Sequence, residues 1–117
     1  PNIVGVTSIT GKTDVLDVVT SATAITTNAS ASGQVYKIGS LIVSNVDGTN
    51  DADITVDLFR SSTAYKIANT IRVPADSTLV LISKDSSIYL EEGDSIRCTG
   101  SAAGDLQAIC SYEIIQD

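Results

Sequence analysis

Residues Thr78 to Ile96 read TLVLISKDSSIYLEEGDSI, and this stretch decides the fold. Short apolar runs at Thr78–Ser83 and Ile88–Leu90 are separated by polar breaks, and Ile96 opens a third run. Strands this short, joined by turns this regular, are typical of antiparallel sandwiches and barrels, not of helical or α/β proteins. In the second break, Gly93 is expected to take a positive φ and to release the chain into the next strand.

The rest of the chain shows the same alternation of short strand-like runs and polar turns. Val35–Val46 is the longest strand-like run, with a bulge expected at Gly39. Ile54–Arg60 alternates most clearly between apolar and polar residues, and Thr63–Val73 returns from it after a turn. Further strands are expected at Asn2–Thr10, Thr13–Val19, Ala22–Thr27, Asp94–Thr99 and Asp105–Ile115, the last two as a closing hairpin. The sequence predicts an all-β fold: a single antiparallel β-sandwich, jelly-roll-like, with eight or nine short strands.

Three connecting segments complete this organisation. Gly11–Lys12 is expected to form a turn, and a helix is the alternative for Asp14–Val19 because a polar residue precedes an apolar cluster. The small residues of Asn28–Gly33 predict a flexible loop. We expect residues 1–117 to form one domain, with residues 1–12 as a candidate N-terminal arm that reaches a neighbouring subunit.

Composition and charge restrict the partners. The chain has 117 residues, a hydrophobic fraction of 43% and a formal net charge of −7. An acidic protein is repelled by DNA and by anionic membranes, so neither nucleic acid nor a membrane is an expected partner. There is no apolar run long enough for a membrane span and no signal-peptide pattern. The start at Pro1-Asn2 fits removal of an initiator Met, and synthesis in a host cytoplasm is expected.

Cys98 and Cys110 are the two cysteines of the sequence. Their positions on the last two expected strands would let them face the same side. Two reduced, buried thiols are the favoured interpretation for a cytoplasmic protein, and a disulfide between them is the alternative. A metal or redox role is disfavoured because there is no His and no third Cys.

Two acidic segments are candidate sites. Asp47, Asn50, Asp51 and Asp53 place oxygen ligands close together, as a calcium loop does, but a solvated Asp-Gly turn is favoured because the bidentate Glu of such loops is missing. Glu91, Glu92 and Asp94 could form an acid/base pair, but their place around a Gly turn favours a charged corner.

The sequence predicts no enzyme and no catalytic, cofactor-binding or metal-binding residue. A Ser-His or Cys-His pair cannot be assembled without His, and Gly11-Lys12-Thr13 lacks the upstream Gly of a phosphate loop. A Ser-Lys arrangement has no motif to support it. The aromatic residues are expected to pack in the core and across strands, with a partner interface as the alternative; they are Tyr36, Phe59, Tyr65, Tyr89 and Tyr112.

The segment from Leu41 to Ile115 resembles small virion structural proteins of tailed phages, especially phages of marine cyanobacteria and other ocean phages. The resemblance is carried by Ser44-Asn45-Val46-Asp47-Gly48, by Val73-Pro74-Ala75 and by Leu90-Glu91-Glu92-Gly93-Asp94-Ser95-Ile96. It implies a capsid or tail component without catalysis. Decoration (cement) proteins of phage heads are commonly small β-domains that bind capsomers as trimers or dimers.

The function expected from this resemblance is a capsid decoration protein that binds the outer head lattice and stabilises it. The expected partners are the major capsid protein and further copies of the chain, as a trimer or dimer, on the outer capsid surface of the virion. The first alternative is a neck or tail-associated virion component. The second is a host-surface or carbohydrate-binding module, which would present exposed Tyr and carboxylates in a shallow groove.

Overall fold

Nine β-strands and the short 3-10 helix η2 make up the structure, a computed structural model that describes residues 5–6 and 8–116. The elements are β1 (Ser8–Asp17), β2 (Thr23–Thr27), β3 (Gln34–Asn45), β4 (Ala52–Arg60), β5 (Thr63–Val73), β6 (Thr78–Ile82), η2 (Lys84–Ser86), β7 (Ile88–Leu90), β8 (Ser95–Gly100) and β9 (Leu106–Gln116).

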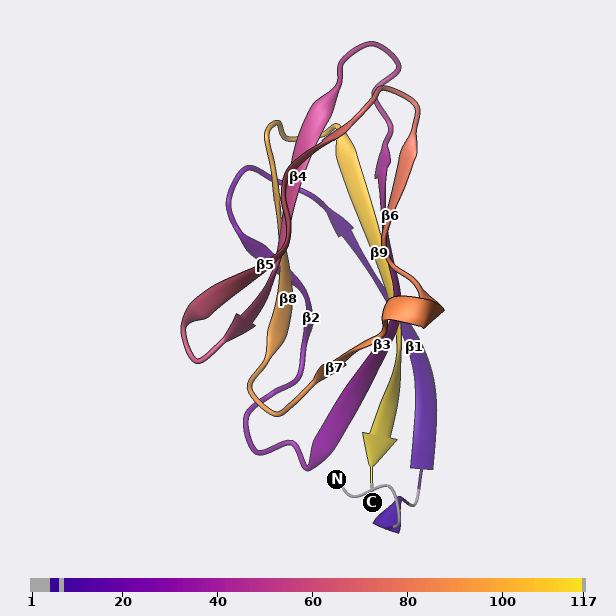
Figure 1. Cartoon of the computed structure of the whole chain (residues 1–117), viewed down its shortest axis with the longest axis vertical. Helices are drawn as coiled ribbons and strands as arrows, with labels where there is room; N and C mark the ends of the chain where they lie inside the picture. The colour runs from indigo at the N-terminus through magenta and orange to yellow at the C-terminus, as the bar shows by residue number, and fades with distance from the viewer. Residues whose placement is uncertain (1–4, 7, 117) are drawn as a thin grey trace.

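The strands form two antiparallel sheets that pack face to face (Figure 1). One is five-stranded, in the order β1-β9-β3-β6 with β7 also beside β3, and the other has the order β2-β8-β4-β5. The first half of the chain pairs with the second half in reverse: β1 with β9, β2 with β8, β3 with β6 and β7, and β4 with β5. Alternate pairs fall in opposite sheets, which is the jelly-roll arrangement. The predicted antiparallel sandwich is confirmed.

The segment that decides the fold has the expected local structure. β6 and β7 both pair with β3, and η2 interrupts them where the polar break was predicted. Gly93 has a φ of 88°, as expected for the corner before β8. Its N–H donates to the Asn28 carbonyl oxygen (2.8 Å), so the corner is tied to the loop that follows β2.

β3 runs through the middle of the five-stranded sheet and has two different faces. The register against β9 shifts between Ile38 and Ser40, which confirms the bulge at Gly39. Leu41 and Val43 are fully buried between the sheets, whereas Ile42 and Ser44 alternate with them and face outward. A strand in this position therefore supplies both the core and the outer surface.

The core lies between the sheets and is almost entirely aliphatic. Its largest fully buried apolar side chains are Val18, Ile38, Leu41, Val43, Ile54, Val56, Val73, Ile82, Leu90, Ile96 and Leu106. At one end, the Tyr112 hydroxyl and the Thr26 hydroxyl both donate to Asp14 Oδ2, at 2.8 and 3.0 Å. Asp14 therefore joins β1 to β9 in its own sheet and to β2 in the other.

Two expectations about secondary structure were wrong, the turn at Gly11–Lys12 and the closing hairpin, and one alternative, the helix at Asp14–Val19, is not formed. Gly11 and Lys12 do not turn but pair with Glu113 and Tyr112 inside β1, because the β9 ladder supplies backbone partners that outweigh turn propensity. The helix considered for Asp14–Val19 is instead the end of β1 and the loop after it.

The last two strands also differ from prediction, because β8 and β9 do not form a hairpin. β8 lies between β2 and β4, and β9 lies between β1 and β3. The loop between them crosses from one sheet to the other. Its Ser101 N–H donates to the Asp53 carbonyl oxygen at 2.9 Å, which fixes the crossing to the start of β4.

The expected N-terminal arm falls partly outside the described residues. Positions 1–4 and 7 are not among them, and Ser8–Lys12 belong to β1. Within the part of the chain that is described, no helix has the length and apolar character needed to cross a membrane.

Candidate functional site

An apolar stripe crosses the outward face of the five-stranded sheet. In the strand register, Val15 lies opposite Ile109, Ile109 opposite Ile42, and Ile42 opposite Val80. Val15 is 73% exposed, Val80 60% and Ile109 38%, and Ile42 is half-buried. Side chains directly opposite on one face lie about 5 Å apart, so these four form one continuous strip, called here the outer stripe.

Polar rows border the outer stripe on both sides. On one side, Gln107 Nε2 donates to Asp17 Oδ1 (3.0 Å), and the Ser44 and Thr78 hydroxyls are 3.1 Å apart. On the other side, the Thr13 and Ser111 hydroxyls are 3.0 Å apart. The polar side chains thus bond to one another, and the stripe has the apolar centre and polar rim of a protein interface.

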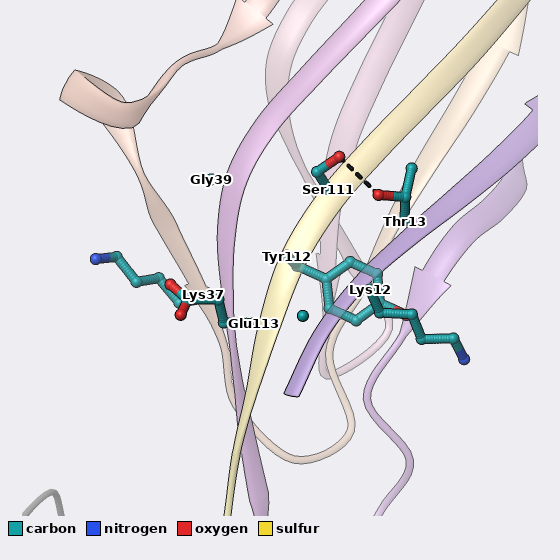
Figure 2. Close-up of a pocket in the computed structure, with 8 residues that line it drawn as sticks. Lys12, Thr13, Lys37, Gly39, Ser111, Tyr112 and Glu113 are labelled. Atoms are coloured by element: carbon teal, nitrogen blue, oxygen red, sulfur yellow. Dashed lines mark hydrogen bonds between the residues drawn. The ribbon is translucent and has the colours of Figure 1, made fainter. Parts of the chain in front are cut away.

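The surface is hollowed at two places along this face. The first hollow, of about 540 Å³, lies over the stripe and is lined by Val15, Leu16, Asp17, Ser44, Gln107, Ala108 and Ile109. The second, of about 440 Å³, is shown in Figure 2 and is lined by Gly11, Lys12, Thr13, Lys37, Gly39, Ser111, Tyr112 and Glu113.

The second hollow exists because two glycines leave the sheet surface bare. A Cβ at Gly11 would meet nothing within 4 Å, and one at Gly39 would meet the Ser111 carbonyl oxygen at 3.8 Å. The side chains around it are held by ordinary sheet contacts, and the Thr13 and Ser111 hydroxyls face each other (Figure 2). Both hollows are open depressions on the outward face of the sheet.

The acidic loop after β3 uses its oxygens to close itself. Asp47 Oδ1 accepts from the N–H groups of Thr49 (2.8 Å) and Asn50 (3.1 Å), and these bonds lower the pKa of Asp47. Asp51 Oδ1 accepts from the Ala75 N–H at 3.0 Å. Among the described residues, no three acidic or sulfur side chains are grouped as a metal site would group them. The geometry is that of an Asp-Gly turn bonded to its neighbours.

The carboxylates at the Gly93 corner belong to an ion-pair cluster. Asp94, whose side chain is 3% exposed, accepts from Arg60 Nε at 2.9 Å and from Arg60 Nη2, and also from the Glu91 N–H at 2.8 Å. Glu91 Oε2 lies 2.7 Å from Arg60 Nη2. The hydrogen bond from Arg60 lowers the pKa of Asp94. The cluster fixes the end of β4 against the start of β8, so its geometry is that of a charged corner.

Cys98 and Cys110 are both fully buried, free thiols. They face the core from opposite sheets, not from one hairpin. Burial raises the pKa of Cys98 to about 12, with a contribution from Cys110, and burial raises the pKa of Cys110 to about 11. A protonated, inaccessible thiol is a poor nucleophile.

We therefore expect both cysteines to resist thiol reagents in the folded protein. An aromatic disulfide reagent at pH 8 should release almost no thiolate chromophore from the native chain and two equivalents in denaturant. Rapid labelling of the native chain would contradict this burial. A folded variant with an exposed cysteine, such as Lys84→Cys, gives the positive control.

The aromatic residues divide between the core and the surface. Tyr36 and Tyr112 stack with ring centroids 5.1 Å apart, as the core-packing prediction requires. Phe59 lies under the Arg97 guanidinium, 3.9 Å from its ring centroid. The prediction is wrong for Tyr65 and Tyr89, which are about half exposed on β5 and β7. They lie on different sheets and do not form one patch.

The sequence did not predict the structural roles of two buried asparagines. Asn28 Nδ2 donates to the Gln34 and Leu90 carbonyl oxygens, both at 3.0 Å. Asn45 Nδ2 donates to the Asn50 and Val73 carbonyl oxygens, both at 2.9 Å. They close the loops at the two ends of β3. An Asn at the edge of an otherwise apolar strand is the signal that could have found Asn45.

Comparison with known proteins supports the fold. No protein-family model matches the chain, and no curated protein matches it. Among solved structures, a chain from Bacillus endospore appendages, which form a novel family of disulfide-linked pili, matches with a TM-score of 0.53 and 19% identity. The match covers 93% of this chain and 88% of that chain. At this identity the similarity concerns the fold alone.

Proposed function

We propose that this chain is a non-enzymatic structural protein of a phage virion, a decoration (cement) protein that binds the outer head lattice through the outer stripe. The observation that carries the proposal is the stripe itself, an exposed apolar strip between rows of mutually bonded polar side chains. Such a surface is suited to docking on a protein of complementary shape. The assignment to a phage virion rests on the resemblance of Leu41–Ile115 to virion proteins of tailed phages.

The charge of the chain supports an exterior position. With a formal net charge of −7, the protein is repelled by packaged DNA and gains nothing from contact with it. The head lattice presents its outer surface in many equivalent copies. A small domain that stabilises the lattice would therefore be expected at high copy number, with the major capsid protein as its partner.

The test is the copy number per purified particle, measured by quantitative mass spectrometry against the major capsid protein. Hundreds of copies are expected for decoration of the head. Copies in the tens would move the protein to the neck or tail, and absence from particles would overturn a virion role. Binding of Ile109→Glu to undecorated heads should be lost, while Lys66→Glu, at an exposed position on β5 in the other sheet, should still bind.

A second candidate is a subunit of a filamentous appendage, which the similarity to the chain from Bacillus endospore pili favours. The cysteines argue against the same cross-linking chemistry, because both are fully buried. Electron microscopy of the concentrated chain distinguishes the two candidates. Filaments that form without heads would support the second, and particles decorated only in the presence of heads would support the first.

A further inference from the structure

Five of the described strands lie at sheet edges: β1, β6 and β7 in one sheet, and β2 and β5 in the other. Four of these edges carry features that hinder further pairing, and β7 is only three residues long. β2 and β6 are five residues long, and β2 has a register shift against β8. β5 is longer, but its register against β4 shifts twice, and Thr70 has a φ of 55°. Lys66 and Arg72 add charges along it. Short strands, bulges and charged side chains are the usual devices that protect an edge.

The edge strand β1 is different. It is ten residues long and pairs with β9 from Ser8↔Gln116 to Asp17↔Gln107 without a register shift. Its side chains are exposed or half-buried along the whole length. Among the described residues, β9 is the one strand that pairs with β1. β1 is thus a long, regular edge open to a further strand.

We propose that β1 pairs with β1 of a second copy of this chain, antiparallel about a two-fold axis at Thr13. In this register, Lys12 of each copy lies opposite Asp14 of the other. Lys12 makes no ion pair within the described residues, and its side chain extends away from β3 and β9 (Figure 2). Asp14 uses Oδ2 for Thr26 and Tyr112, and Oδ1 is directed to no described donor.

Charge and side-chain direction together select this register. A shift of two residues in one direction places Lys12 opposite Lys12, and in the other direction it places Asp14 opposite Asp14. Like charges directly opposite destabilise a strand pair. A shift of one residue turns the outward face of one copy toward the inner side of the other. The register centred on Thr13 avoids each of these costs.

The pairing joins two five-stranded sheets into one continuous sheet. Odd-numbered residues of β1 face outward in both copies, so both outer stripes lie on the same face, on either side of the Thr13 row. The pairing does not depend on binding to a virion. It goes beyond the proposed function by assigning the edge, the symmetry and the register of self-association.

The first test is sedimentation velocity of the full chain over a range of concentrations. The wild-type chain should form a dimer, and Lys12→Glu should weaken dimerisation by about tenfold or more, because four like charges then meet across the axis. Lys37→Glu makes the same charge change on β3, inside the sheet, and should leave the dimer intact. A monomer at the highest soluble concentration, or a trimer, would overturn the proposal.

The second test reads the register directly. Under mild oxidation, Thr13→Cys should form a disulfide-linked dimer, because the two-fold axis brings residue 13 of each copy face to face. Val15→Cys is at an exposed position too but should not cross-link, because the two substituted positions are offset by four residues, about 13 Å along the strands. Cross-linking of Val15→Cys as fast as Thr13→Cys would overturn the register. The native cysteines are buried and give no background.

Discussion

Replacing Leu41 with alanine is expected to lower the free energy of unfolding by about 3 kcal/mol, whereas replacing its neighbour Ile42 should cost less than about 1.5 kcal/mol. Leu41 is fully buried between the sheets, so truncation leaves a cavity in a close-packed core. Ile42 faces outward in the outer stripe and is half-buried. Urea denaturation followed by circular dichroism measures both values.

The same pair of variants separates stability from binding. Ile42→Ala should bind heads more weakly than wild type although it is nearly as stable, because the stripe has lost its central side chain. Leu41→Ala should bind normally at a temperature where it is folded. If both variants lost stability equally, β3 would not have the two different faces described above.

Asp94→Asn is expected to lower the free energy of unfolding by about 2 kcal/mol, because it leaves the Arg60 guanidinium without its buried counter-charge. Glu92→Gln makes the same charge change two residues earlier, on an exposed side chain, and should change stability by less than about 0.5 kcal/mol. Urea titration at pH 7 compares the two. Equal losses would mean that net charge, and not the pair with Arg60, is responsible.

The Asp94 carboxylate also predicts a dependence on pH. The hydrogen bond from Arg60 lowers its pKa in the folded protein, so the unfolded chain binds a proton more readily at this position. The stabilisation is fully present above the unfolded value of about 4 and is lost as the pH falls through the folded value. Between pH 7 and pH 3, wild type should therefore lose more stability than Asp94→Asn does.

Local features of the fold were predictable because turns are determined by the residue types at and next to the turn. The breaks around η2, the positive φ of Gly93 and the bulge at Gly39 depend on residues close in sequence. The prediction of a closing hairpin was wrong because the pairing of strands depends on packing between segments that are distant in sequence. A loop that looks like a hairpin turn can equally cross between sheets, as the segment after Gly100 does.

The surface was harder to predict than the strands. Tyr65 was expected to pack in the core or across strands, but the register of β5 against β4 shifts twice, and Tyr65 and Ile71 are both exposed on this strand. The outer stripe takes one residue from each of four strands. Each of these residues is unremarkable in its own segment, and the strip appears only when the register is known. For this reason the candidate site could not be read from the sequence.

The place of β9 has a consequence for biosynthesis. β9 is synthesised after the other eight strands described, yet it lies between β1 and β3, which are made early. Until it emerges, both neighbours expose unpaired backbone, and non-local pairing of this kind folds slowly. A nascent or truncated chain that lacks β9 would therefore form an incomplete sheet, whose unpaired strand edges make it prone to aggregation. The completion of β9, and not the earlier pairing of β4 with β5, should be the event that commits this domain to its native state.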